Sequence, residues 1–287
     1  MPSLAMLFQT ELDPTLTGEQ LVARMLADFP DLDPSLLSTE PSAGADAPLT
    51  LGYGEQMIAL LGVPAPVGDD LTEIAAFSRL WPTDVPAPSD YAAHTIVTVL
   101  RPGEAGSGQS AVHVESISDA VLLSKAIASA IALSDSIVAV YFGSANHLVA
   151  PAMFRDMAIE TLPQPMLPAW VALNIAPRPD GIMTGHTRGL DMLGLMDVEI
   201  VASHESAEET FGRIVNTAIY QLENGPVIGD GDTLGATAAA EVVAHHAASQ
   251  VEIDKTVLSL EFVGEEFPEL EPPADQPQKR RWFGRKR

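Results

Sequence analysis

The sequence contains no cysteine among its 287 residues. This absence excludes disulfide bridges, thiolate nucleophiles, zinc–thiolate sites and iron–sulfur clusters. Aromatic residues make up only 6% of the chain, but 46% of it is hydrophobic, so alanine and valine supply much of the expected core. We therefore predict a globular chain in which any metal ligand is an oxygen or an imidazole nitrogen.

The sequence also lacks a recognisable targeting signal and a long apolar run. Its first residues include neither a basic segment nor a small-residue cleavage site, which argues against a signal peptide. The longest apolar stretch, residues 120–133, contains Ser124, Lys125 and Ser129 and is shorter than the roughly 20 residues that cross a bilayer. We expect a soluble, cytoplasmic protein without a transmembrane segment.

Basic residues are scarce, because 15 Lys and Arg stand against 39 Asp and Glu, for a net charge of −24. Six of the 15 lie in the last nine positions, so residues 1–278 carry nine basic residues and a net charge of −30. Such a surface repels phosphate backbones, and we do not expect it to bind nucleic acid. The alternative role of this charge is simply to keep the protein soluble.

The hydrophobic pattern predicts two successive β-α-β-β-α-β series. In the first, strands at 4–9, 49–53, 56–63 and 94–100 alternate with helices that begin after Thr17 and Asp70. A long helix at 116–133 leads to the second series, whose clearest helix follows the capping box Ser206–Glu209. The fold class expected is α+β, with two ferredoxin-like halves, suggestive of a cryptic duplication, that share mixed or antiparallel sheets with packed helices.

These patterns divide the chain into four segments. Residues 1–110 form an N-terminal α+β half, and residues 111–263 form a C-terminal α+β half of the same globular unit. Residues 264–278 are acidic and rich in proline, without apolar periodicity, and are expected to be a disordered linker. Residues 279–287 form a basic, aromatic tail.

The segment after the clearest helix is the first candidate site. Asp230 and Asp232 flank a glycine and precede Thr233, so both carboxylates are able to face one cation or one hydroxylated ligand. The pattern is similar to the start of a calcium loop, but no acidic residue stands at the last ligand position, and no metal is predicted. The alternative interpretation is a tight turn in which the Asp side chains accept hydrogen bonds from local amides.

A second candidate combines His186 and Arg188 with the nearby carboxylate of Asp191. An imidazole and a guanidinium are suited to acid–base work and to anion binding. The alternative is that both make ordinary loop contacts. No phosphate loop, dinucleotide-binding glycine pattern, nucleophile elbow or zinc-binding helix is present in the sequence, so neither a cofactor nor an established enzyme class is indicated.

Several short blocks together resemble a bacterial family called domain of unknown function 4261. They include Leu80-Trp81-Pro82, Ala169-Trp170-Val171, Thr187-Arg188-Gly189-Leu190 and Gly229-Asp230-Gly231-Asp232-Thr233. The resemblance extends over most of residues 4–263 and does not include the linker or the tail. It implies an extent and a type of fold, and no mechanism.

The sequence favours a non-catalytic protein-interaction module over an enzyme. The alternative is an enzyme or small-ligand binder that uses residues 229–233, together with His186 and Arg188, around a shared cleft. In either case the tail is a candidate docking peptide. Its residues are Lys279, Arg280, Arg281, Trp282, Phe283, Gly284, Arg285, Lys286 and Arg287.

Three targets compete for the tail: an anionic membrane surface, nucleic-acid phosphates and the acidic body of the protein itself. The net charge of −30 on residues 1–278 opposes the first two and favours the third, or an acidic protein partner. The remaining alternative is a solvated chain end without a function.

Overall fold

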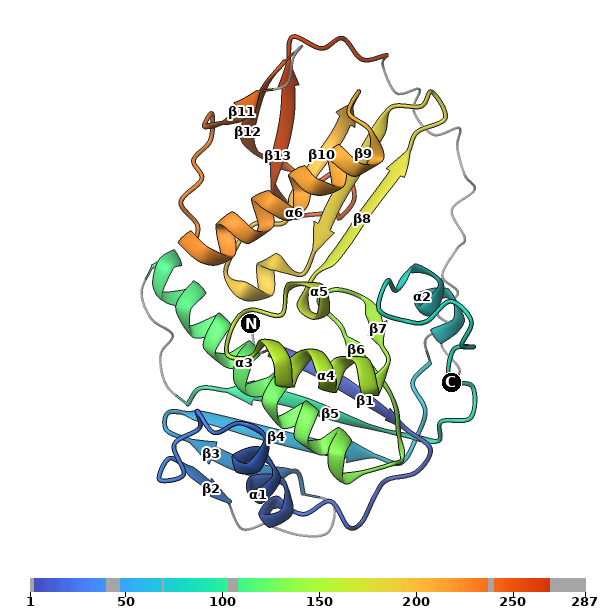
Figure 1. Cartoon of the computed structure of the whole chain (residues 1–287), viewed down its shortest axis with the longest axis vertical. Coiled ribbons are helices and arrows are strands. Elements are labelled where there is room, and N and C mark those ends of the chain that lie inside the picture. The colour runs from blue at the N-terminus through green and yellow to red at the C-terminus, as the bar shows by residue number, and fades with distance from the viewer. Residues whose placement is uncertain (1–2, 40–46, 69, 103–107, 237–239, 269–287) are drawn as a thin grey trace, which may run out of the picture.

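The computed structural model describes residues 3–39, 47–68, 70–102, 108–236 and 240–268. The described residues form an α+β protein with six α-helices and two sheets. The two sheets follow one another along the long axis of the molecule (Figure 1). Sheet A has seven strands in the order β2-β3-β4-β5-β1-β6-β7, and neighbouring strands in it pair antiparallel. Sheet B has six strands in the order β11-β12-β13-β10-β9-β8 and is mixed, because β10 and β13 run parallel.

The first seven strands and four of the helices build the part around sheet A. Their bounds are β1 Ser3–Gln9, α1 Gly18–Asp28, β2 Leu37–Thr39, β3 Leu49–Tyr53, β4 Gln56–Val63, α2 Leu71–Phe77, β5 Ala93–Leu100, α3 Gln109–Leu133, β6 Ile137–Phe142, β7 His147–Val149 and α4 Pro151–Thr161. The part around sheet B follows. Its elements are α5 Leu167–Trp170, β8 Ala172–Pro177, β9 Met183–Arg188, the 3-10 helix η1 Leu190–Leu193, β10 Val198–Ser203, α6 Ala207–Asn224, β11 Thr233–Ala236, β12 Glu241–Ala248 and β13 Thr256–Val263.

Sheet A is covered on both faces along β1, β6 and β7. Along β1, Leu7 enters the large core under α1, α3 and α4, whereas the next residue, Phe8, enters a smaller core under α2 with Trp81 and Leu148. Successive side chains of a strand point to opposite faces, so a strand buried on both sides is apolar at nearly every position. This explains why the longer strands β1 and β6 are readily predicted from the sequence.

Helix α3 is the central helix of the large core and contacts α1, α4 and three strands of sheet A. Its length and apolar composition would allow it to cross a membrane. However, 56% of its apolar 18-residue segment is buried inside the protein, and the core helix of a soluble protein has the same length and composition. The carboxylate of Asp28 ties three helices together here. It accepts hydrogen bonds from Arg24 in its own helix, from Ser129 in α3 and from both terminal nitrogens of Arg155 in α4.

Within the part of the chain that the structure describes, sheet B is covered by a helix on one face only. Helix α6 packs over β8, β9 and β10 (Figure 1), and a Cβ added to Gly185 would lie 2.3 Å from Ile214 of this helix. Met183 and Thr187 share the Gly185 face of β9, so Thr184, His186 and Arg188 point to the opposite face. The uncovered face of sheet B is therefore the polar one.

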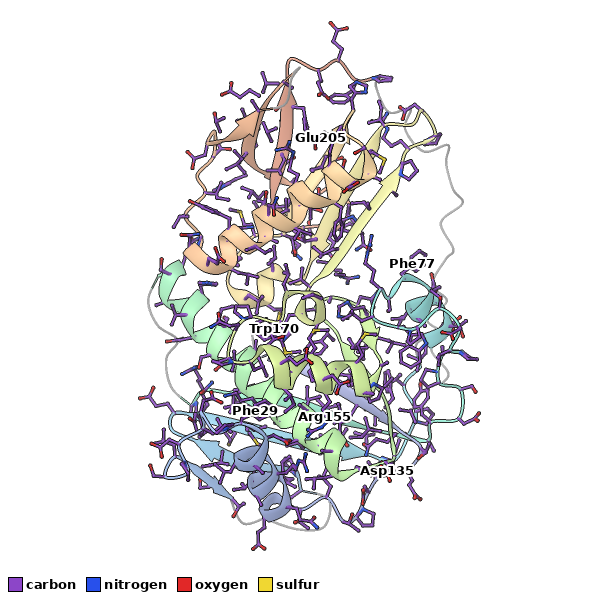
Figure 2. All side chains as sticks on the ribbon, viewed as in Figure 1. Phe29, Phe77, Asp135, Arg155, Trp170 and Glu205 are labelled. Carbon is purple, nitrogen blue, oxygen red and sulfur yellow. The ribbon has the colours of Figure 1, made fainter. Side chains whose placement is uncertain are left out.

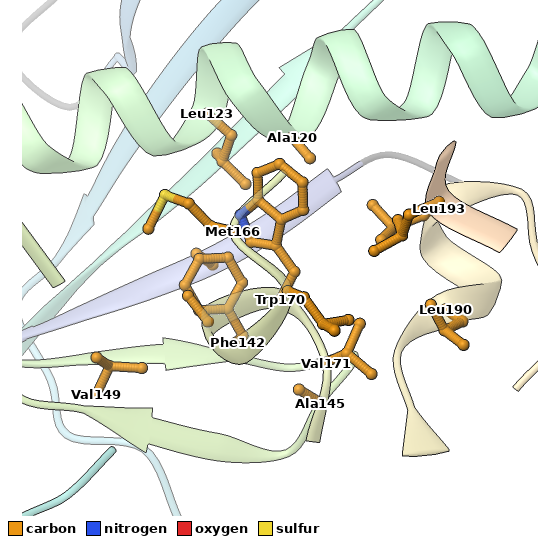
Figure 3. Packing of buried hydrophobic residues seen from close by; sticks show 14 of the residues in the cluster. Ala120, Leu123, Phe142, Ala145, Val149, Met166, Trp170, Val171, Leu190 and Leu193 are labelled. Atoms are coloured by element: carbon orange, nitrogen blue, oxygen red, sulfur yellow. The ribbon is translucent and has the colours of Figure 1, made fainter. Parts of the chain in front are cut away.

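One continuous core joins the two sheets. Trp170, at the end of α5, packs under α3 beside Leu123 and Phe142, and its indole nitrogen donates to Ser124 of α3 (Figure 3). Leu190 and Leu193 of η1 belong to the same cluster (Figure 3). The two sheets are thus held as one packed unit.

The structure confirms the α+β class and most predicted elements, but it differs from the prediction at several points. Sheet A continues to Val149 and sheet B begins at Ala172, so the sheets do not divide the chain at residue 110. The ferredoxin-like halves and the duplication are not confirmed. Helix α3 begins at Gln109, seven residues before the predicted start at Ser116.

The predicted linker also begins with ordered contacts. Phe267 stacks on His204 with ring centroids 4.9 Å apart, and the carbonyl of Pro268 accepts a hydrogen bond from Arg178. Residues 264–268 thus pack against the ends of β8 and β10. The stacking of Phe267 on His204 holds this segment in place although most of its neighbours in the sequence are polar. The rest of the linker and the tail, residues 269–287, lie outside the described residues.

Candidate functional site

A cavity of about 630 Å³ opens where sheet B meets the part built around sheet A. We call it the junction cavity. Its lining comes from α2, from the turn between β6 and β7, from β8 and β9 and from the loop between β12 and β13. The lining residues are Phe77, Ala145, Asn146, His147, Ala172, Asn174, Ile175, Ala176, Thr184, Gly185, His186, Arg188, Val251 and Glu252.

The polar wall of the junction cavity lies on the uncovered face of sheet B, where it is formed by Asn174, Thr184, His186 and Arg188. His186 in β9 pairs in register with Asn174 in β8 and with Glu199 in β10, so the three side chains share this face. The side-chain amide nitrogen of Asn174 lies 3.3 Å from Nε2 of His186. Arg188 pairs with Glu252 at 2.8 Å.

Both imidazoles that line the junction cavity are neutral at physiological pH. Burial lowers the pKa of His186, and the attraction of Glu199 and Asp197 offsets this only in part. Burial also lowers the pKa of His147, whose Nε2 donates to the carbonyl of Ala169 at 2.7 Å. Neither ring therefore supplies a positive charge to the cavity near pH 7.

A buried network fixes the segment that follows His186. Asp197, only 2% exposed, accepts hydrogen bonds from Thr187, from the amides of Gly189 and Leu190, and from Lys255 at 2.6 Å. Gly189 has a φ of +120°, and a Cβ there would lie 2.6 Å from the carbonyl oxygen of Trp170. The segment from Thr187 to Leu190 therefore positions Arg188 and seals the junction between the sheets.

The loop between β12 and β13 forms the rim of the junction cavity. The carboxylate of Glu199 anchors it by accepting hydrogen bonds from the hydroxyl of Ser249 and the amide of Gln250. Val251 and Ile253 extend from this anchored loop and are 55% and 93% exposed. Across the cavity Phe77 is 74% exposed at the level where the two parts meet (Figure 2). The rim is thus apolar although the wall is polar.

Carboxylates outnumber cations around the junction cavity. Lys255 bridges Asp191, Asp197 and Glu252, and Glu252 also pairs with Arg188. Burial alone lowers the pKa of Lys255, but its hydrogen bonds to Asp197 and Glu252 outweigh that effect and raise the pKa above its usual value. With Glu199 and with Arg79, which borders the neighbouring small cavity, the charges are three cations against four carboxylates. The net charge of these surrounding groups is −1, and of them only Arg188 and Glu252 line the cavity itself.

The lining shows no arrangement for nucleophilic or metal chemistry. Thr184, the hydroxyl residue among the described lining residues, donates to the carbonyl of Ala176 at 3.1 Å and does not contact His186. A hydroxyl nucleophile needs a base within hydrogen-bond reach. Among the residues that the structure describes, no group of three or more His, Asp or Glu side chains is placed to hold a metal ion.

The loop that carries Asp230 and Asp232 forms a tight turn. The carboxylate of Asp232 accepts from the amide of Gly229 at 2.7 Å, and that of Asp230 accepts from the amide of His246 at 2.9 Å. This last bond is the main reason that the pKa of Asp230 is lowered. Thr233 donates to Glu241 at 3.0 Å. Asp232 therefore caps an amide of its own turn, as in the alternative interpretation, whereas Asp230 joins the turn to β12.

The structure brings His186 and Arg188 together in the junction cavity and places Thr233 in another cavity, of about 450 Å³, beside α6. Asp230 contacts β12, and strands β13 and β10 lie between β12 and β9. The two predicted candidate segments therefore do not line a shared cleft.

Sequence reasoning did not select Phe77, Asn174 or Glu252. The one sequence signal for Asn174 is the alternation of side chains between the two faces of a strand. In the pairing of β8 with β9 it places Asn174 beside His186 on the same face.

Residues 186–261 match the model of a family described as Domain of unknown function (DUF4261). The match includes the segments 187–190 and 229–233 that carry the resemblance seen in the sequence, and it confirms the resemblance over this range. It covers β9 to β13 and so contributes His186, Arg188 and the rim loop to the junction cavity. No curated protein and no solved structure matches the chain.

Proposed function

We propose that this chain with a DUF4261 segment is a non-catalytic interaction module that binds a cationic, aromatic group, such as the side chains of a basic peptide, in the junction cavity. The observation that carries the proposal is the combination of an apolar rim, a polar wall and an excess of carboxylates around one concave site. Its volume lies within the roughly 300–1,000 Å³ usual for ligand sites.

Each part of the site has a role in this proposal. Phe77 offers an exposed ring for stacking and for a cation–π contact. Asn174 and the neutral His186 supply hydrogen-bonding groups that carry no charge. Glu252 supplies negative charge at the rim, although it shares this charge with Arg188.

Two indoles of opposite charge test the proposal by titration calorimetry on the full chain. Tryptamine carries an ammonium group, and indole-3-propionate carries a carboxylate on an otherwise similar skeleton. We expect tryptamine to bind at least about tenfold more tightly, because a net charge of −1 around the site attracts the ammonium group and repels the carboxylate, each by on the order of 1 kcal/mol. Equal affinity for the two probes, or no binding of tryptamine either to the full chain or to a chain without residues 279–287, would overturn the proposal.

Variants locate the binding. Phe77→Ala and Glu252→Gln should each weaken tryptamine binding, whereas the matched control Tyr220→Ala should not. Tyr220 is also an exposed aromatic residue, 49% exposed, but it lies on α6 beside the other cavity. An equal loss with Tyr220→Ala would place the binding elsewhere on the surface.

A further inference from the structure

We infer that the occupant of the junction cavity is the protein's own C-terminal tail, with Trp282 and Phe283 seated against Phe77 and Val251. This inference rests on the proposed function and names its partner. Three observations carry it: the place where the described chain ends, the length of the segment that follows, and the match of charge and apolar character.

The described chain ends beside one wall of the junction cavity. The carbonyl of Pro268 accepts a hydrogen bond from Arg178, which directly follows β8, and Phe267 is held by stacking on His204. Ala172, Asn174 and Ala176 of β8 line the cavity. The chain therefore leaves the described part at one end of the strand that forms the wall.

The remaining chain is long enough to return along this strand. Thirteen residues separate Pro268 from Trp282, and an extended chain of this length spans up to roughly 45 Å. Strand β8 has six residues, which corresponds to about 20 Å. A tether of this kind holds a terminal peptide at an effective concentration on the order of 1 mM, so even a weak site becomes occupied.

The chemistry of the tail matches that of the site. Trp282 and Phe283 are adjacent aromatic residues, and the apolar rim contains the exposed Phe77 and Val251. Six basic residues surround the aromatic pair, while residues 1–278 carry a net charge of −30. The aromatic pair fits the rim, and the basic residues meet the carboxylates around it.

Competition with tryptamine tests the inference on the intact chain and on a chain without residues 279–287. If the tail occupies the junction cavity, its removal should strengthen tryptamine binding about tenfold, as follows from a tail affinity near 0.1 mM at an effective concentration of about 1 mM. A synthetic peptide of residues 279–287 added in trans should reverse the gain. The matched peptide with Trp282 and Phe283 replaced by Ala should not.

Tryptophan fluorescence gives an independent readout on the full chain. Trp81 and Trp170 are buried at 7% and 3% exposure, so acrylamide quenching reports mainly on Trp282. We expect Trp282 to be quenched less in the protein than in the free peptide, and Phe77→Ala to increase its quenching. Tyr220→Ala is the control that should leave it unchanged.

The outcomes separate the inference from the proposed function. If tryptamine binds the full and shortened chains equally and Trp282 is quenched as in the free peptide, the tail does not occupy the cavity, while the proposed function stands. If tryptamine binds neither chain, both are overturned. If the tail peptide binds but Phe77→Ala has no effect on it, the tail docks elsewhere and the inference is wrong.

Discussion

The two sheets of this protein are buried in different ways. Sheet A has a core on each face, so Leu7 and Phe8 of one strand enter different clusters. Sheet B has α6 on one face and leaves Asn174, His186 and Glu199 in a row across the other. A sheet buried on both faces offers only its edges for recognition, whereas a sheet buried on one face presents side chains at fixed spacings. We therefore expect substitutions around sheet A to change mainly stability, and substitutions on the uncovered face of sheet B to change mainly the proposed binding.

The largest expected effect is a loss of stability when the contacts between the helices that cover sheet A are removed. Asp28→Ala leaves Arg155 and Arg24 without their shared carboxylate, and we expect a loss of about 3 kcal/mol in the free energy of unfolding, because removing one partner of a buried ion pair strands the other. Urea unfolding followed by circular dichroism measures it. Glu160→Ala, on the exposed side of α4, should change stability by less than about 0.5 kcal/mol. A loss below about 1 kcal/mol for Asp28→Ala would contradict the assignment.

The same carboxylate predicts how stability depends on pH. Burial raises the pKa of Asp28, but hydrogen bonds from Arg155, Arg24 and Ser129 dominate and lower it to about 2, from the usual 3.8. A pKa depressed in the folded state stabilises the protein above the unfolded value and loses that effect as the pH falls through the folded value. The stability gap between the wild type and Asp28→Asn should therefore be constant above about pH 5 and shrink towards pH 2. A gap that persists unchanged at pH 2.5 would be inconsistent with this pKa.

Two glycines at the covered face of sheet B, Gly185 in β9 and Gly212 in α6, should respond to substitution by alanine in opposite ways. Gly185→Ala places a Cβ 2.3 Å from Ile214, and we expect a loss of about 1–2 kcal/mol. Gly212→Ala, in α6 with open space around it, should instead add about 0.5–1 kcal/mol because alanine favours helix. Adding Ile214→Val to Gly185→Ala should restore part of the loss. Thermal unfolding of the four proteins tests the set, and the same sign for both glycine variants would contradict it.

The sequence predicts local structure better than it predicts the arrangement of the sheets. The capping boxes at Thr17 and Ser206 are present as predicted, because their hydrogen bonds involve residues only three positions apart. The prediction missed the short strands β2, β7 and β11, since three or four residues carry too little pattern. It also placed β6 with the second half, although β6 pairs with β1 across more than 120 residues of chain. Such pairings leave no trace in local periodicity.

The candidate site, too, could be predicted from the sequence only where local patterns mark its residues. His186 and Arg188 stand out in the sequence because a histidine and an arginine alternate with small residues along one strand. Phe77 looks like an ordinary apolar residue of a short helix, and only the fold shows it exposed at the rim of the junction cavity. The spacing of Asp230 and Asp232 resembles a cation site, yet Asp232 accepts a hydrogen bond within its own turn and Asp230 accepts one from the amide of His246 in β12.

The smallest expected effect concerns the pH dependence of binding at the uncovered face of sheet B. Burial lowers the pKa of His186, which faces Glu199, Asp197, Glu252 and Arg188, so the ring is neutral at pH 7 and gains a proton only below its usual value of 6.5. A protonated ring repels the ammonium group of tryptamine, which stays charged below about pH 9. At a separation of several ångströms near a protein surface this repulsion is about 1 kcal/mol, or roughly fivefold in affinity. Tryptamine binding should therefore be constant from pH 7.5 to about 6.5 and weaken towards pH 5. His186→Gln, which cannot gain a proton, should bind tryptamine with little change over the same range. Calorimetric titrations of both proteins at pH 5.0, 6.0 and 7.5 test this, and parallel pH profiles would show that His186 does not face the bound cation.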